Sequence, residues 1–76
     1  MIKKKKILIG FGERVKQFRK EKGISQEELS FRAGLHRTYI GMIERAEKNI
    51  TLVNIEKIAN ALEVTVKELM NFANGK

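Results

Sequence analysis

Residues 25–45, SQEELSFRAGLHRTYIGMIER, predict two short helices joined by a tight turn. Ser25 and Glu28 have the spacing of a capping box, in which each side chain accepts a backbone N–H at the start of a helix. Gly34 can adopt a positive φ without a Cβ penalty and is typical of a residue that ends a helix. The first helix is therefore expected to end near Ala33, and the second is expected to begin about three residues later.

The second of these helices has few side chains that a core requires. When Ile40 and Ile43 face inward, the spacing of about 100° per residue turns other side chains away from the core. They are Thr38, Gly41, Met42 and Arg45, with Arg37 and Tyr39 on the two flanks. Arginine can form two hydrogen bonds to guanine, and threonine or methionine can pack against a thymine methyl group. The turn and this composition predict a helix-turn-helix that inserts its second helix into the major groove. The spacing alone also fits a plain pair of helices with a solvated outer face.

The rest of the chain continues the helical pattern. Apolar residues at helical spacing predict helices over 11–22 and 51–62, and a second capping box, Thr65 to Glu68, begins a fifth helix. That helix is expected to bring Val66, Leu69, Met70 and Ala73 together and to end at Gly75. The predicted architecture is all-α, with five short helices in one compact domain over 11–76. Residues 1–10 are expected to form a basic N-terminal arm.

Composition and charge limit the possible classes of protein. The chain has no Cys and one His, which excludes disulfides and Cys/His zinc sites and suits a cytoplasmic protein without metal or cofactor. No apolar run is long enough to span a membrane. The net charge of +7 resides in residues 1–22, because residues 23–76 carry equal numbers of acids and bases. Such a charge favours an anionic partner, with nucleic acid ahead of an acidic membrane surface, although a solvated lysine tail would give the same total.

Enzymatic chemistry finds little support in the sequence. There is no Asp, no nucleophile beside a base, and no strand before the short GFG at 10–12 that a phosphate-binding loop would need. We therefore expect a binding protein rather than an enzyme.

The stretch SQEELSFRAGLHRTYIGMIER resembles the helix-turn-helix of lambda-repressor-like (Cro-type) regulators, whose domain has five helices. HRTYIGMIER, followed by NITLVNIEKIANALEV, is similar to controller proteins of restriction-modification systems, and the resemblance runs from about residue 13 to 71. It implies a homodimer that binds palindromic operators in double-stranded DNA. The dimer would activate its own gene and an endonuclease gene at low occupancy and repress at high occupancy, with RNA polymerase as a further candidate partner. A phage-type repressor, an antitoxin-type autorepressor and a non-DNA interaction module are the alternatives.

The resemblance also implies roles for individual residues. Arg37, Thr38, Tyr39 and Met42 are the expected base contacts, and the expected backbone contacts are Ser25, Gln26, His36, Arg45, Lys48 and Asn49. Arg19 and Glu44 match a pair that bridges the first and third helices. His36 could equally cap the third helix or be a solvated bystander, and Met42 could be surface without a role. A surplus of apolar residues toward the C-terminus predicts a dimer interface, unless they only fill the core: Ile50, Leu52, Val53, Val66, Met70 and Phe72.

Overall fold

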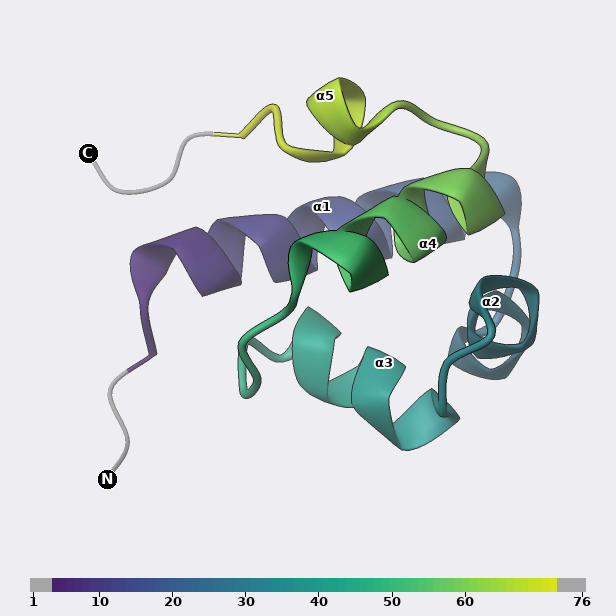
Figure 1. Ribbon diagram of the computed structural model, residues 1–76, viewed down its shortest axis with the longest axis horizontal. Helices are drawn as coiled ribbons and strands as arrows, with labels where there is room; N and C mark the ends of the chain where they lie inside the picture. The colour runs from purple at the N-terminus through teal and green to yellow at the C-terminus, as the bar shows by residue number, and fades with distance from the viewer. Residues whose placement is uncertain (1–3, 73–76) are drawn as a thin grey trace.

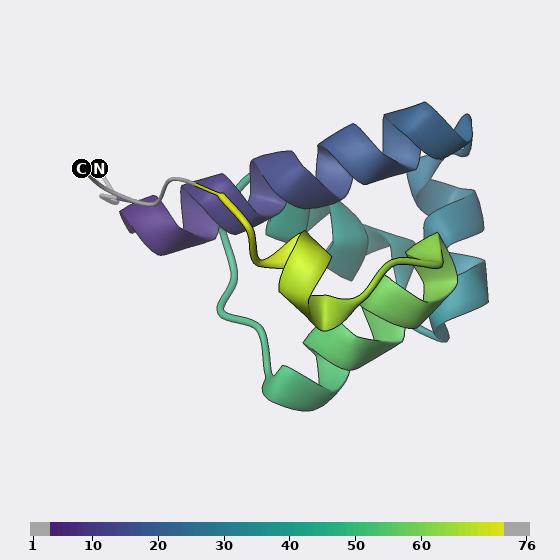
Figure 2. The same ribbon diagram turned by 90° about the horizontal axis from the view of Figure 1, so that it is seen from above.

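Five helices follow one another along residues 4–72, the part of the chain that the computed structural model describes. They are α1 (Lys6–Lys22), α2 (Gln26–Ala33), α3 (Arg37–Glu44), α4 (Leu52–Leu62) and α5 (Val66–Leu69). α1 packs against α3, α4 and α5, while α2 packs against α3 and α4. Figure 1 shows α1 running behind α4, with α3 below and α2 at one end. Seen from above, α5 covers the space between α1 and α4 (Figure 2). The predicted all-α fold of five helices is confirmed.

The centre of the core takes one fully buried aliphatic side chain from each helix. These side chains are Val15, Leu29, Ile40, Ile58 and Leu69. Burying such a side chain contributes about 1.5–3 kcal/mol relative to leaving it in water. Because every helix supplies one of them, the five helices stabilise one another around a single core.

Left-handed residues end most of the helices. Gly23 and Gly34 follow α1 and α2 with φ of 73° and 69°, as the sequence predicted. Ala46 and Glu63 adopt the same region with φ of 62° and 60°, after α3 and α4. A left-handed conformation is strained for a residue with a Cβ, so these two ends could not be predicted from residue type.

The first helix begins at Lys6, five residues before the predicted start, so residues 6–10 are helical and do not belong to an arm. Gly10 and Gly12 weaken the helical signal here, since glycine is a poor helix former. Tertiary contacts compensate for this weakness. A Cβ at Gly10 would overlap the Phe72 ring, and a Cβ at Gly12 would lie 2.5 Å from the backbone oxygen of Ile43.

The fifth helix is shorter than predicted, because it ends at Leu69. The chain then leaves the helical path, and Phe72 packs against Gly10 of α1 and the edge of the core. The predicted helical positions at Ala73 and Gly75 lie outside the described residues. Within residues 4–72, no helix combines the length and apolar composition that crossing a bilayer requires.

The two predicted capping boxes differ in outcome. At α5, Thr65 accepts the backbone N–H of Glu68, and the Glu68 carboxylate accepts that of Thr65, so the box is complete. At α2, the Ser25 hydroxyl accepts the N–H of Glu28, but the Glu28 carboxylate accepts a hydrogen bond from Arg32 Nε at 2.8 Å. The reciprocal half of the first box is therefore wrong, because the arginine one turn later competes for the carboxylate.

Candidate nucleic-acid interface

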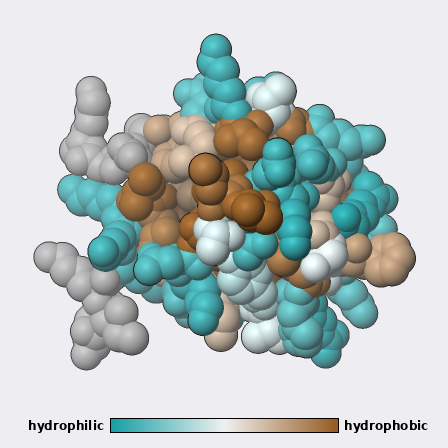
Figure 3. All heavy atoms as spheres, viewed as in Figure 1, coloured by the Kyte–Doolittle hydropathy of each residue, from teal (hydrophilic) through white to brown (hydrophobic). Residues whose placement is uncertain are grey.

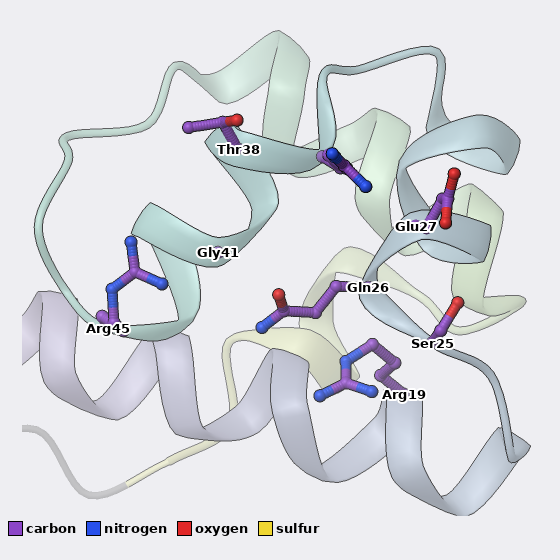
Figure 4. A pocket seen from close by; sticks show the side chains of 8 residues that line it. Arg19, Ser25, Gln26, Glu27, Thr38, Gly41 and Arg45 are labelled. Atoms are coloured by element: carbon purple, nitrogen blue, oxygen red, sulfur yellow. The ribbon is translucent and has the colours of Figure 1, made fainter.

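A polar hollow lies on the outer side of the helix-turn-helix, between the start of α2 and the exposed face of α3 (Figure 4). Its lining residues are Arg19, Ser25, Gln26, Glu27, Arg37, Thr38, Gly41 and Arg45. Three of the eight are arginines and one is an acid. The N-terminal end of α2 also opens here, and its free backbone N–H groups suit an anion such as a phosphate.

A buried ion pair fixes α3 to α1 beneath this hollow. Arg19 Nε donates to Glu44 Oε2 at 2.7 Å and Arg19 Nη2 donates to Oε1 at 3.1 Å, with the two side chains 11% and 2% exposed. The structure thus brings together the pair that the resemblance indicated. Such a two-point contact sets the orientation of α3 as well as its position.

Gln26 completes this network from α2. Its Nε2 donates to Glu44 Oε1 at 3.0 Å, and Figure 4 shows its side chain reaching inward between α3 and α1. Glu44 therefore accepts from two other helices and does not present its charge to the surface. An acid on the flank of α3 that would otherwise repel phosphates is neutralised by this arrangement.

Gly41 lies under the side chain of Arg45 and does not form an open gap on the surface. A Cβ at Gly41 would come within 3.0 Å of Arg45 Nη1 and 3.5 Å of Gln26 Oε1. Arg45 Nε also forms an ion pair with Glu47 Oε1 at 3.1 Å. The glycine lets the guanidinium lie close to the helix, where it still lines the hollow.

The four expected base contacts do not share one surface. Arg37 and Thr38 are exposed at the start of α3 and line the polar hollow. Tyr39 is half-buried against the core, and its hydroxyl accepts a hydrogen bond from Asn54 Nδ2 at 3.1 Å. Met42 is half-buried and lines a separate hollow beside the first turn of α1. The helical spacing alone placed Met42 on the open face; the early start of α1 explains why it is partly covered.

The expected backbone contacts are divided between the two hollows and the start of α3. His36 precedes α3, and its Nδ1 accepts the N–H of Thr38 at 3.1 Å, so it acts as a cap. Lys48 and Asn49 are exposed in the loop after α3. Ser25 caps α2 and lines the polar hollow beside Gln26.

The expected dimer residues fall into two groups. Leu52 and Val53 at the start of α4 are 77% and 61% exposed, and Val66 on α5 is also exposed. Ile50, Met70 and Phe72 are half-buried and pack against the core. Figure 3 shows apolar side chains gathered in the middle of the face over the start of α4 and α5, surrounded by hydrophilic ones.

Sequence reasoning missed several residues that shape this side of the molecule. Gly12 allows α1 to approach the backbone of α3, and Asn54 holds the Tyr39 hydroxyl. Lys4 and Lys5, which were expected to lie in a basic arm without a specific role, line the second hollow together with Lys48. The glycine within an apolar helical stretch was the one available signal, because a mid-helix glycine often marks a close approach of backbone.

Comparisons with known proteins agree with this geometry. A helix-turn-helix family model matches residues 15–69. Control protein C.BamHI of Bacillus amyloliquefaciens is 52% identical over 63 residues, which span 82% of this chain and 78% of that protein. The crystal structure of the restriction-modification controller protein C.AhdI from Aeromonas hydrophila has 48% identity and a TM-score of 0.80, over 82% of this chain and 94% of that one. SinR, a master regulator for biofilm formation solved in complex with DNA, has 40% identity and a TM-score of 0.76, over 80% and 98%.

Proposed function

This chain belongs to the helix-turn-helix transcriptional regulators of the restriction-modification controller type, and we propose that it binds palindromic operators as a homodimer. Its own gene and an endonuclease gene would be the targets. Binding at low occupancy activates them and binding at high occupancy represses them. In this proposal α3 enters the major groove, and the start of α2 and the loop after α3 contact phosphates on either side.

The outer face of α3 is the observation that carries the proposal. Arg37 and Thr38 are exposed at its start, with Arg45 one helical turn beyond Gly41. The ion pair between Arg19 and Glu44 holds this face in a fixed orientation from behind. A fixed orientation matters because a hydrogen bond to a base edge tolerates little displacement.

A dimer follows from how little DNA one short helix can contact. α3 has eight residues, which is enough for only a few base pairs. Two-fold symmetry doubles the contact and requires half-sites about one DNA turn apart. Leu52, Val53 and Val66 follow the helix-turn-helix in the sequence, and their exposed apolar side chains support an isologous contact there between two copies of the chain.

Replacing Arg37 with alanine tests the base-contacting role. Affinities of the parent and of Arg37→Ala are measured at one salt concentration for a duplex from upstream of the chain's own gene and for its scrambled counterpart. We expect the variant to lose about 1–3 kcal/mol on the first duplex, as for one bidentate base contact, and much less on the second.

Arg32→Ala is the matched control, because Arg32 is an exposed arginine of α2 that does not line the polar hollow. It removes the same charge and should retain the preference for the upstream duplex. Equal proportional losses on both duplexes by Arg37→Ala would contradict the proposal.

Footprinting the upstream DNA separates the controller role from a phage-type or antitoxin-type autorepressor. A controller should protect a high-affinity palindrome at low concentration and a weaker second site that overlaps the promoter at higher concentration. Protection of one site that blocks the promoter at every concentration would favour simple autorepression.

A further inference from the structure

A second surface hollow lies between the start of α1 and the loop that follows α3. Its lining residues are Lys4, Lys5, Leu8, Met42, Ala46, Glu47, Lys48 and Asn49. Leu8, Met42 and Ala46 supply apolar surface, while Lys4, Lys5 and Lys48 are exposed around it. Lysine stems lie along apolar surface and keep their ammonium groups in water. The hollow therefore gathers three positive charges beside one apolar patch.

The local charge in this hollow is strongly positive. Glu47 is its one carboxylate, and this carboxylate already forms an ion pair with Arg45 at 3.1 Å. The first turn of α1 contains no acidic residue. The hollow therefore has three lysines against one carboxylate that is already paired with arginine, and this net positive charge attracts an anion from solvent.

The hollow adjoins the C-terminal end of α3. Met42 belongs to α3 itself, and Lys48 and Asn49 belong to the loop that follows it. Arg37, at the other end of α3, lines the polar hollow. If α3 lies in the major groove, the phosphate backbone of one DNA strand would run along the start of α2. The backbone of the other strand would run along the loop after α3 and the start of α1.

We propose that Lys4 and Lys5, beside Lys48, form a second phosphate-binding edge that contacts the DNA backbone next to the groove occupied by α3. This inference rests on the proposed function and adds a contact from residues that precede the matched helix-turn-helix region, which begins at residue 15. Because Lys5 immediately precedes α1, the helix fixes where this edge lies relative to α3. Phosphates carry no sequence information, so the edge adds affinity without adding preference.

The dependence of affinity on salt tests this edge directly. Each phosphate neutralised by a lysine contributes about 0.9 to the slope of log affinity against log salt. We compare the parent, Lys4→Gln/Lys5→Gln, and the matched control Lys16→Gln/Lys20→Gln, which removes two exposed lysines farther along α1. Both variants lose the same charge. We expect the first to reduce the slope by nearly two units and the control to change it by a small fraction of that.

Affinities for the upstream duplex and its scrambled counterpart should fall by the same factor in Lys4→Gln/Lys5→Gln. In ethylation interference, ethylating certain phosphates next to the groove should weaken binding of the parent. Ethylating the same phosphates should not weaken binding of this variant. A slope equal to that of the control would overturn the inference. In that case the proposed function would still stand if the parent preferred the upstream duplex to the scrambled one. A parent that showed no such preference would contradict the proposed function itself.

An acidic membrane surface is the other partner that exposed lysines could attract. Vesicles of phosphatidylcholine with and without phosphatidylserine test it. The inference would also be overturned if the parent bound phosphatidylserine vesicles, Lys4→Gln/Lys5→Gln abolished this binding, and the variant left the salt slope on DNA unchanged. Absence of vesicle binding together with the reduced DNA slope would support it.

Discussion

Gly12 determines how closely the first helix approaches α3. A Cβ at this position would lie 2.5 Å from the backbone oxygen of Ile43 and 2.8 Å from that of Glu44. Backbone atoms cannot move aside as a side chain does, so α3 itself would have to shift. Gly12 does not line the polar hollow, yet it affects the orientation of α3, the helix that we propose contacts DNA.

We expect Gly12→Ala to lower the free energy of unfolding by about 1–3 kcal/mol, which is the usual effect of overpacking. Alanine favours a helix by about 1 kcal/mol over glycine, and the clash must exceed that gain. Gly10→Ala is the comparison variant, because its Cβ would meet the ring of Phe72, a half-buried side chain at the edge of the core, which can shift at less cost than backbone can. Urea denaturation of both variants measures the difference. Equal stabilities would contradict the assigned role of the backbone contact.

Individual residues also show where sequence reasoning fails. Periodicity placed Thr38 and Arg37 correctly on exposed surface, because their positions depend only on which way α3 turns. Met42 is half-buried because another element covers it, and helical spacing contains no information about neighbouring elements. Glu28 was assigned to a capping box that Arg32 disrupts, since two local partners compete for one carboxylate.

At the scale of elements, α5 is held by its neighbours rather than by its own length. It has four residues, and a single helical turn is unstable in isolation. Leu69 is fully buried, and Arg14 Nε of α1 donates to the Glu68 backbone oxygen at 3.1 Å. α5 also packs against α4, and the capping box adds a hydrogen bond in which the Glu68 carboxylate accepts the Thr65 N–H at 2.8 Å.

The same box makes this helix sensitive to pH. The hydrogen bond from the Thr65 backbone, with a smaller contribution from its hydroxyl, holds the pKa of Glu68 below the ordinary glutamate value. A lowered pKa in the folded state stabilises the fold above the ordinary glutamate pKa. That stabilisation is lost as the pH falls through the folded-state pKa.

We expect Thr65→Ala to raise the pKa of Glu68 only part of the way toward its ordinary value, because the hydroxyl is lost while the backbone N–H remains. The variant should also cost about 1 kcal/mol at neutral pH, as loss of an N-cap does. The difference in stability from the parent should shrink as the Glu68 carboxylate protonates. NMR titration of the carboxyl carbons measures the pKa. Thr51→Ala is the control, because Thr51 caps α4 by accepting the N–H of Asn54 and has no carboxylate partner. A Glu68 pKa that Thr65→Ala leaves unchanged would refute the contribution of the hydroxyl.

Whole-helix boundaries were predictable where a local residue determines them. Gly23 and Gly34 were predicted to end helices and Thr65 to begin one, and the structure has these boundaries at the same residues. The early start of α1 and the early end of α5 accompany the contact between Gly10 and Phe72, which joins residues near the two ends of the described chain. Local signals cannot specify such a contact.

At the scale of the molecule, the polar hollow on α2 and α3 is separate from the apolar surface over the start of α4 and α5 (Figure 3), although Phe31 on α2 is also an exposed apolar side chain. The fold class was predictable from helical periodicity, whereas the proposal that α3 faces DNA also needed the composition of its outer face and the resemblance to known regulators. The two separate hollows along α3 were not, because they require the placement of α1.

The apolar surface leads to a prediction about assembly. We expect Leu52→Glu to convert the proposed dimer to a monomer, since Leu52 is 77% exposed and its replacement should not disturb the core. Phe31→Glu is the control, because Phe31 is an 82% exposed apolar side chain on α2. Sedimentation velocity at matched concentrations compares both with the parent. A Leu52→Glu variant that sediments as the parent dimer does would place the interface elsewhere.

The central claim is that the outer face of α3 enters the major groove. Intermolecular NOEs in a complex with the upstream duplex test it most directly. We expect NOEs from the Thr38 methyl group and the Arg37 side chain to major-groove protons, such as thymine methyls and cytosine H5. Their absence, together with NOEs to DNA from α4 and α5 instead, would contradict the claim.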